Sequence, residues 1–224
     1  MGGIIRNCIF RQNVCEGGSG GGALQLHGAG PVEVSNCTFS DNMSAGAGPA
    51  IFCYWTDASI KDCVFVRNQS SYNGAVSLCE ASPTITCCTF ADNFGPMGII
   101  TVGLRSNPIV ENTIISFNHN GPALAWDSIQ PGVPTLTCCD LYENAGGDWV
   151  DFVAAQYGIN GNFSADPVFC GRSTGNLMLS AVSPCVPGNH PDGADCGLIG
   201  ALGVGCGPTA VHNTTWGRVK SMFR

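Results

Sequence analysis

Six copies of a seven-residue pattern are the strongest constraint on how this chain can fold. Each copy has Cys or Thr at its second position, Phe, Ile or Leu at its fourth, and Asn at its last. The second positions are Cys8, Cys37, Cys63, Cys88, Thr113 and Cys139. They recur every 25 to 29 residues, a period typical of a solenoid with one coil per copy.

The pattern also predicts which side chains point inward. An aliphatic residue lies three positions before each Cys or Thr, and a large apolar residue follows two positions after it. The third pattern position, between the Cys or Thr and the large apolar residue, varies freely and is for example Ile9 in one copy and Asp140 in another. Such variation is expected on the outward side of a strand. The large inward residues are expected to be Phe10, Phe39, Phe65, Phe90, Ile115 and Leu141.

The Asn that closes each copy predicts a ladder of stacked amides. Asn tolerates left-handed backbone angles, and its side chain can hydrogen-bond a neighbouring turn. Paired strands lie about 4.8 Å apart, so amides on adjacent coils would be within bonding distance. The ladder residues are Asn13, Asn42, Asn68, Asn93, Asn118 and Asn144.

A further short strand is expected in each middle coil, because an apolar run follows a Gly or Gly-Pro turn at 23–26, 50–53, 75–78, 99–102 and 123–126. With three short strands per coil, residues 1–207 resemble the right-handed β-helix repeat proteins of the pectin-lyase-like superfamily, which are secreted by bacteria. The resemblance implies an all-β, right-handed parallel β-helix of about six coils. It does not specify an activity, because that superfamily includes lyases, hydrolases and adhesins.

The composition excludes some classes of function. The net charge is −7 and the nine Lys and Arg residues are scattered, whereas nucleic-acid binding needs clustered basic residues. No run of 18 apolar residues is present, so no transmembrane segment is predicted. The chain also starts without a signal peptide. We therefore expect the C-terminal part of a longer secreted or cell-surface protein, with the signal peptide upstream.

The cysteines of the repeat are expected to be free thiols. The Cys at the second pattern position points inward, where Cys behaves as a small apolar residue. Cys87 and Cys138 precede this row, but they lie two coils apart, roughly 9.6 Å, which is too far for a disulfide between them.

Three regions are predicted: β-helix repeats over 1–147, a C-terminal capping segment over 148–207, and a basic tail over 208–224. Segments 162–170, 175–179 and 183–185 resemble the closing segment of such β-helices. The resemblance implies a disulfide-tied cap, in which we expect the pairs Cys170–Cys185 and Cys196–Cys206. In the tail, Thr215 could cap a short helix with Trp216, Val219, Met222 and Phe223 on one face.

Metal binding is weakly indicated. Paired Cys and His at zinc spacing are absent, so no metal ligand is assigned. The cap carries Asp166, Asp192 and Asp195, whose oxygens suit calcium. Turn formation by Asp in a Pro/Gly-rich loop is the preferred interpretation of these residues.

Catalytic groups would lie on the outward faces of the expected strands. The first-strand rows are Gln25, Phe52, Ser77, Thr101 and Ala125, and His27, Tyr54, Cys79, Gly103 and Asp127. Glycosidic hydrolysis needs paired carboxylates within one site. No row places two carboxylates on adjacent coils, so we predict no catalytic residue.

Binding is better supported by the residues that follow the first strands. Aromatic faces beside carboxylates and Arg are typical of sugar-binding grooves. The candidate ligand-binding residues are Tyr54, Trp55, Asp57, Glu80, Arg105 and Asp127. The alternative is that Tyr54 and Trp55 only cover a loop.

Two functions therefore remain open. One is a non-catalytic extracellular β-helix that acts as a scaffold, adhesin or glycan-binding module, with a polysaccharide or cell-surface glycan as partner. The other is the C-terminal portion of a polysaccharide lyase or glycoside hydrolase whose catalytic coils lie upstream.

Overall fold

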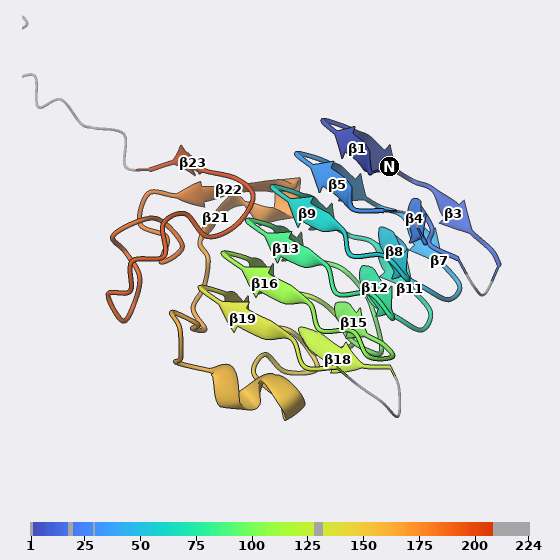
Figure 1. Ribbon diagram of the computed structural model, residues 1–224. Coiled ribbons are helices and arrows are strands. Elements are labelled where there is room, and N and C mark those ends of the chain that lie inside the picture. Colours follow the sequence, from blue (N-terminus) through green and yellow to red (C-terminus); the bar gives the residue numbers. More distant parts are fainter. Residues whose placement is uncertain (1, 18–19, 29, 128–131, 208–224) are drawn as a thin grey trace, which may run out of the picture.

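The structure, a computed structural model, describes residues 2–17, 20–28, 30–127 and 132–207. These residues form a parallel β-solenoid whose coils follow one another along a single axis (Figure 1). The predicted all-β fold is thus confirmed. The tail 208–224, including the expected helix after Thr215, lies outside the described residues.

Three parallel sheets run the length of the solenoid, because each strand pairs with the equivalent strand one coil away. The first sheet contains β1 (Gly3–Arg6), β5 (Val32–Ser35), β9 (Ser59–Lys61), β13 (Thr84–Thr86), β16 (Ile109–Glu111) and β19 (Thr135–Thr137). The second contains β2 (Ile9–Arg11), β6 (Thr38–Ser40), β10 (Val64–Val66), β14 (Thr89–Ala91), β17 (Ile114–Ser116) and β20 (Asp140–Tyr142). The third contains β4 (Leu24–His27), β8 (Ile51–Tyr54), β12 (Val76–Cys79), β15 (Ile100–Val102) and β18 (Leu124–Trp126).

A small additional sheet joins early coils through β3 (Val14–Cys15), β7 (Met43–Ser44) and β11 (Gln69–Ser70). Two-residue turns separate the first sheet from the second. In each such turn one residue, for example Asn36 or Cys87, adopts a positive φ, so the chain changes direction sharply while both flanking strands stay paired.

The solenoid continues beyond the six coils that the repeat predicts. Phe163 forms a parallel bridge with Asp140, and Asn162 Oδ1 accepts a hydrogen bond from the Cys139 N–H at 3.0 Å. Asn162 Nδ2 donates to the Leu136 carbonyl at 2.9 Å. Asn162 therefore stacks on Cys139 in a further, incomplete turn that contains the 3-10 helix η1 (Asp151–Gln156).

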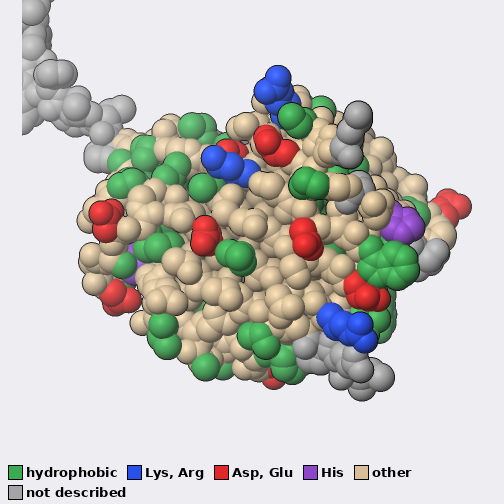
Figure 2. Space-filling view, viewed as in Figure 1, with side chains coloured by type: hydrophobic (Ala, Val, Ile, Leu, Met, Phe, Trp, Pro, Cys, Tyr) green, Lys and Arg blue, Asp and Glu red, His purple; other side chains and the backbone are tan. Residues whose placement is uncertain are grey.

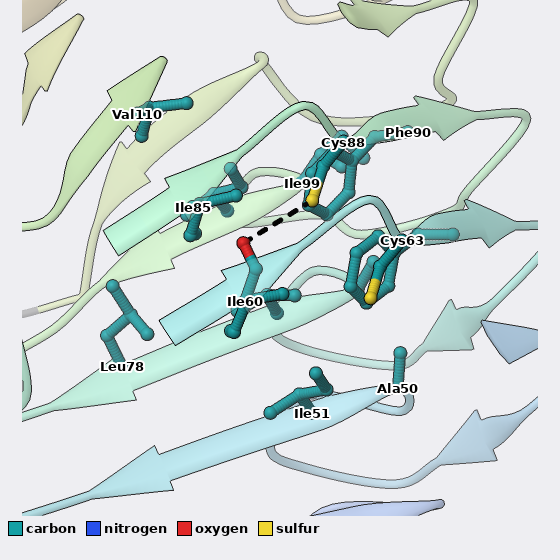
Figure 3. Packing of buried hydrophobic residues seen from close by; sticks show 14 of the residues in the cluster. Ala50, Ile51, Ile60, Cys63, Leu78, Ile85, Cys88, Phe90, Ile99 and Val110 are labelled. Atoms are coloured by element: carbon teal, nitrogen blue, oxygen red, sulfur yellow. Dashed lines mark hydrogen bonds between the residues drawn. The ribbon is translucent and has the colours of Figure 1, made fainter. Parts of the chain in front are cut away.

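The core is a stack of equivalent side chains. The rings of Phe10, Phe39, Phe65 and Phe90 lie parallel, with centroids 4.3 to 5.1 Å apart. Figure 3 shows the aliphatic stack of Ile60, Ile85 and Val110 beside them. Phe39, Phe65 and Phe90 are fully buried, as the repeat predicts.

The Asn ladder is also confirmed. Asn42 Nδ2 donates to Asn68 Oδ1 at 2.8 Å, and Asn68 Nδ2 donates to Asn93 Oδ1 at 3.0 Å. The same oxygens accept the backbone N–H of the preceding ladder residue. Each inner amide also donates to a carbonyl of the previous coil, as Asn68 does to Phe39. Polar groups inside the solenoid are thereby satisfied.

The inward cysteines are free thiols with a defined role. Cys63 Sγ donates to the Lys61 carbonyl at 3.1 Å, and the Thr113 hydroxyl makes the equivalent bond to Glu111 at 2.8 Å. Cys88 Sγ also lies 3.7 Å from the Ile60 carbonyl of the preceding coil (Figure 3). Burial raises the pKa of the Cys139 thiol to about 12, which keeps it protonated and unreactive.

The capping segment covers more of the solenoid than expected. Its first part closes the open end of the last coil, because Val153 of η1 is buried in the core and Phe152 stacks on Trp126 with ring centroids 4.3 Å apart. Its later part turns back and covers the outer face of the second sheet (Figure 1). Its elements are β21 (Phe169–Gly171), η2 (Arg172–Thr174), β22 (Asn176–Ser180) and β23 (Val204–Cys206). Leu177 packs on Val64, Val66 and Ala91. The variable third position of the pattern was expected to face solvent. It is buried in the later copies, at Val64, Thr89, Ile114 and Asp140, whereas Ile9 in the first copy is 76% exposed.

Polar contacts fix the cap to the middle coils. Arg172 Nε lies 3.0 Å from Asp92 Oδ1, and its guanidinium lies 4.0 Å from the centre of the Phe117 ring. The Ala201 N–H donates to the Thr89 hydroxyl at 2.9 Å. Two of these contacts join residues that are 80 and 112 positions apart in the chain.

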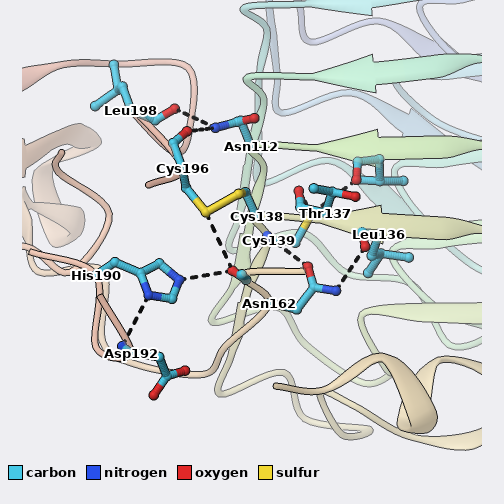
Figure 4. Close-up of a disulfide and its surroundings, with 12 residues drawn as sticks. Asn112, Leu136, Thr137, Cys138, Cys139, Asn162, His190, Asp192, Cys196 and Leu198 are labelled. Atoms are coloured by element: carbon cyan, nitrogen blue, oxygen red, sulfur yellow. Dashed lines mark hydrogen bonds between the residues drawn. A yellow bond between two sulfur atoms is a disulfide. The ribbon is translucent and has the colours of Figure 1, made fainter. Parts of the chain in front are cut away.

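The disulfide pairs differ from those expected. Cys138 is bonded to Cys196, and Cys170 to Cys206, while Cys185 is a free, buried thiol. The predicted pairs Cys170–Cys185 and Cys196–Cys206 are therefore wrong. Figure 4 shows that the first bond joins the cap to the turn between the first two sheets, where Asn112 donates to the Cys196 and Leu198 carbonyls.

Phe65→Ala should lower the free energy of unfolding by about 3–5 kcal/mol, because it opens a cavity within the ring stack. Denaturant unfolding followed by circular dichroism measures the change. Ile9→Ala, on the exposed side of the equivalent strand, should change it by less than about 0.5 kcal/mol. Similar effects of the two substitutions would contradict the stacked core.

Peptide mapping without reduction should recover Cys138 linked to Cys196 and Cys170 linked to Cys206, with Cys185 alkylated only after unfolding. The Cys138–Cys196 bond spans 58 residues, for which the chain-entropy model gives about 4 kcal/mol. Cys138→Ser should destabilise by an amount of this order, whereas Cys87→Ser, at the equivalent turn position two coils earlier, should not.

Asp140 should make stability pH-dependent. Burial raises its pKa to about 8, although its Oδ1 accepts the Ala165 N–H at 3.0 Å. Between about pH 4 and 8 the folded protein keeps a proton that the unfolded chain has released. The free energy of unfolding should therefore fall as the pH rises, by at most about 1.4 kcal/mol per pH unit from this group.

Asp140→Asn tests this assignment. The amide can accept from Ala165 and donate to Cys185 Sγ, which lies 3.3 Å from Asp140 Oδ2. The variant should lose stability with pH less steeply than the parent in urea melts. The exposed Asp151→Asn should leave the pH dependence unchanged. A parent whose stability is flat over this range would contradict a protonated Asp140.

Candidate ligand-binding face

The candidate site lies on the outer face of the third sheet. Strand alternation directs one set of side chains into the core and the other outward. In β8, Ile51 and Cys53 are buried in the core, while Phe52 and Tyr54 face out. The parallel register places Tyr54 between His27 of β4 and Cys79 of β12, and Phe52 between Gln25 and Ser77.

A row of turn residues follows these strands. Gly28, Trp55, Glu80 and Arg105 all have φ between 48° and 54° and end successive strands of the sheet. The Trp55 N–H donates to the Cys79 carbonyl and the Glu80 N–H to the Leu104 carbonyl, so the row is in register. A left-handed conformation is costly for a bulky residue such as Trp. The Trp55 ring lies on the outer face of the sheet, 6.0 Å from the ring of His27.

Aromatic rings gather at the early coils of this face. Tyr54 and Trp55 are stacked with centroids 4.6 Å apart, and the His27 ring lies 4.9 Å from Tyr54. Phe52 lies 6.0 Å from Tyr54. Trp55 remains 53% exposed. The group of His27, Phe52, Tyr54 and Trp55 is named the aromatic face below.

A hollow of about 540 Å³ lies beside Trp55 and is lined by Asp57, Glu80, Thr56, Gly30 and Pro31. The structure thus brings together three of the predicted residues, Trp55, Asp57 and Glu80. Asp57 Oδ1 accepts the Ser82 N–H at 2.7 Å, so one of its oxygens already holds the next coil. Both carboxylates are acceptors for hydroxyl groups.

The remaining predicted residues are distributed differently. Arg105 continues the turn row one coil beyond Glu80 but does not line this hollow. Asp127 lines a separate hollow with Phe52 and Tyr72. Tyr72 was missed because it lies in a loop outside the repeat, where sequence gives no signal of its direction. His27 and Phe52 belong to the outward rows, so the repeat itself contained their signal.

No group of three or more His, Cys, Asp or Glu side chains with metal-binding geometry occurs in the described parts of the chain. Asp166, Asp192 and Asp195 are thus not gathered into one such group. Asp166 Oδ1 instead accepts the Val168 N–H at 2.8 Å, which is the turn-forming role.

Three basic side chains, Arg11, Arg67 and Arg172, lie along one row with Asp41 and Asp92 between them. On the side shown in Figure 2, Lys and Arg lie apart from one another, while hydrophobic side chains at the right-hand edge adjoin a His and an acidic residue. Within the described ranges, no helix is long and apolar enough to span a membrane.

The repeat, the three parallel sheets and the Asn ladder agree with one family. The family model for the right handed beta helix region matches residues 1–115, about half of the chain. The chain belongs to the right-handed β-helix family. Comparisons with curated proteins and with solved structures gave no match.

The β-helix match includes the aromatic face and the turn row from Gly28 to Arg105. Asp127, the last coils and the cap lie beyond it. Membership in the β-helix family specifies the scaffold, whereas an activity depends on side chains that the scaffold displays.

Proposed function

We propose that this β-helix is a non-catalytic extracellular scaffold that binds a glycan at the aromatic face. The observation that carries the proposal is the stacked pair of Tyr54 and Trp55, which leaves Trp55 53% exposed beside a hollow with two carboxylates. Sugar rings have apolar C–H faces that pack on aromatic rings, while their hydroxyls bond carboxylates.

The position of Trp55 supports binding over simple loop cover. A Trp that only covered a loop would be expected to bury its ring, since burial of that surface is what stabilises it. Here the backbone adopts a costly left-handed conformation and the ring is still half exposed. The same conformation recurs at Glu80 and Arg105 of the turn row, so the exposed ring, and not the backbone, is what favours binding.

The negative charge of the hollow limits the class of glycan that can bind there. Asp57 and Glu80 line it, and no Lys or Arg is among its lining residues. Polyuronates would be repelled by this pair of carboxylates, because like charges at short range are unfavourable. Neutral or cationic glycans fit better.

An extracellular location is supported by the two disulfides, since such bonds persist mainly in oxidising compartments. A non-catalytic role is supported by the use of Asp57 as a backbone acceptor. Glycosidases use a pair of carboxylates that act on one bond, and the backbone of the next coil already occupies one oxygen of Asp57.

Trp55→Ala should weaken glycan binding about tenfold, the loss expected for an aromatic stacking contact of 1–1.5 kcal/mol. The parent is first screened on a glycan array, and the best ligand is then titrated by calorimetry. The unfolding midpoint should change little because the ring is outside the core. Tyr157→Ala, which removes another exposed aromatic near the end of the solenoid, is the matched control. Equal binding by both variants would refute the proposal.

A further inference from the structure

We propose that the hollow between Phe52, Tyr72 and Asp127 is a second subsite that takes a sugar unit bearing a protonated amine. The inference rests on the glycan-binding role proposed above and adds the class of sugar. It concerns a different hollow from that beside Trp55, so the two can be tested separately.

The pocket has the size and walls of a small-molecule site. Its volume is about 300 Å³, and its lining includes Phe52, Tyr72, Asn73, Ser77, Cys79 and Asp127. This volume is at the lower end for ligand sites, which suits a single ring. Phe52 comes from β8, Ser77 and Cys79 from β12, and Tyr72 and Asn73 from the loop that precedes β12.

Two buried polar atoms of this pocket have no partner. Asn73 is 7% exposed and Ser77 is 1% exposed, yet Asn73 Oδ1 and Ser77 Oγ make no hydrogen bond within the protein. Buried polar groups are almost always bonded, and an unmet one costs about 1–3 kcal/mol. A ligand group that bonds them would recover that cost.

The direction of these groups follows from their positions. Val76 and Leu78 pack in the core, so Ser77 between them faces the pocket. The loop that carries Asn73 is anchored, since the Asn73 N–H donates to the Gly46 carbonyl. Asn73 Oδ1 can only accept hydrogen bonds. The missing partner is therefore a donor.

The charge of the pocket favours a cation. Asp127 is the charged residue of the lining, and no Lys, Arg or His is among the lining residues. Desolvation raises the pKa of the Cys79 thiol, and the negative charges of Glu80 and Asp127 raise it further. The Asp127 carboxylate is therefore close enough to influence a charged group in the pocket. Phe52 and Tyr72 add aromatic faces, which attract ammonium groups.

These features select the ligand chemistry. An ammonium group has three donors. The pocket lining includes the Asp127 carboxylate and, enclosed behind the surface, the unpartnered acceptors Asn73 Oδ1 and Ser77 Oγ. An acetylated amine has lost the charge and two of the donors. A uronic acid would bring a carboxylate towards Asp127. The pocket should thus prefer a glucosamine unit to its N-acetyl or uronate counterpart.

The experiment compares three tetramers by calorimetry: β-1,4-linked glucosamine, the same chain N-acetylated, and galacturonate. The glucosamine tetramer should bind roughly fivefold or more tightly than the acetylated one, as a contact of about 1 kcal/mol predicts. Asp127→Asn should abolish that preference, and Asp195→Asn, an exposed acid of the cap, should retain it. An equal affinity for the first two tetramers would overturn the proposal.

Cys79 provides a local readout. It is a half-exposed free thiol in this pocket, and Cys15 is a half-exposed free thiol elsewhere. Bound glucosamine tetramer should slow alkylation of Cys79 but not of Cys15, as measured by peptide mass spectrometry. Binding that leaves the Cys79 rate unchanged would place the amine elsewhere and refute the subsite.

The outcomes separate this subsite from the proposed function. Glycan binding that depends on Trp55 but shows no preference for the amine would refute the subsite alone. Protection of Cys79 that persists in Trp55→Ala with undiminished affinity would refute the role of the aromatic face alone. Absence of binding by every tetramer and by the glycan array would refute both.

Discussion

The rest of the structure depends on the pairing of each coil with its neighbours through backbone hydrogen bonds and stacked amides. A coil of about 25 residues has no core of its own, so it is stable only when both edges are bonded. The Asn68 and Asn93 amides complete this pairing at the tight turn, where strand bonding alone would leave carbonyls unmet. Thr113 can take the place of Cys in the inward row, because its hydroxyl donates to the carbonyl two residues earlier, as the Cys63 thiol does. The inward positions are therefore selected for size and for donor capacity together.

Much of the fold could be predicted because the repeat samples each position six times. Inward rows, the ladder and the sheet order all follow from that sampling. The cap could not be placed, since its residues occur once and its contacts with Val64, Thr89 and Asp92 join distant parts of the chain. The disulfide pairs were predicted wrongly for the same reason, because they involve residues of the cap that occur only once. Cys138 was considered only as a partner of Cys87, whereas its real partner comes from the cap that folds back.

The candidate site was predictable in part for similar reasons. Trp55 and Glu80 occupy equivalent turn positions, so the repeat places them side by side. Asp127 is assigned to the same face correctly but contributes to another hollow. Tyr72 and Asn73 come from a loop outside the repeat, and their arrangement depends on packing that a period cannot reveal. The orphaned Ser77 hydroxyl is likewise visible only once the covering loop is in place.

The folded-back cap changes how a pulling force would pass through the molecule. In a bare solenoid, tension on the C-terminal end would peel off the last coil and then each coil in turn. Here Arg172 and Leu177 attach to middle coils, and the Cys138–Cys196 bond joins the cap covalently to the coil before the last. Load entering after Cys206 is therefore shared by several coils at once and acts across the strands rather than at one end. A protein of this design resists mechanical unravelling as a block.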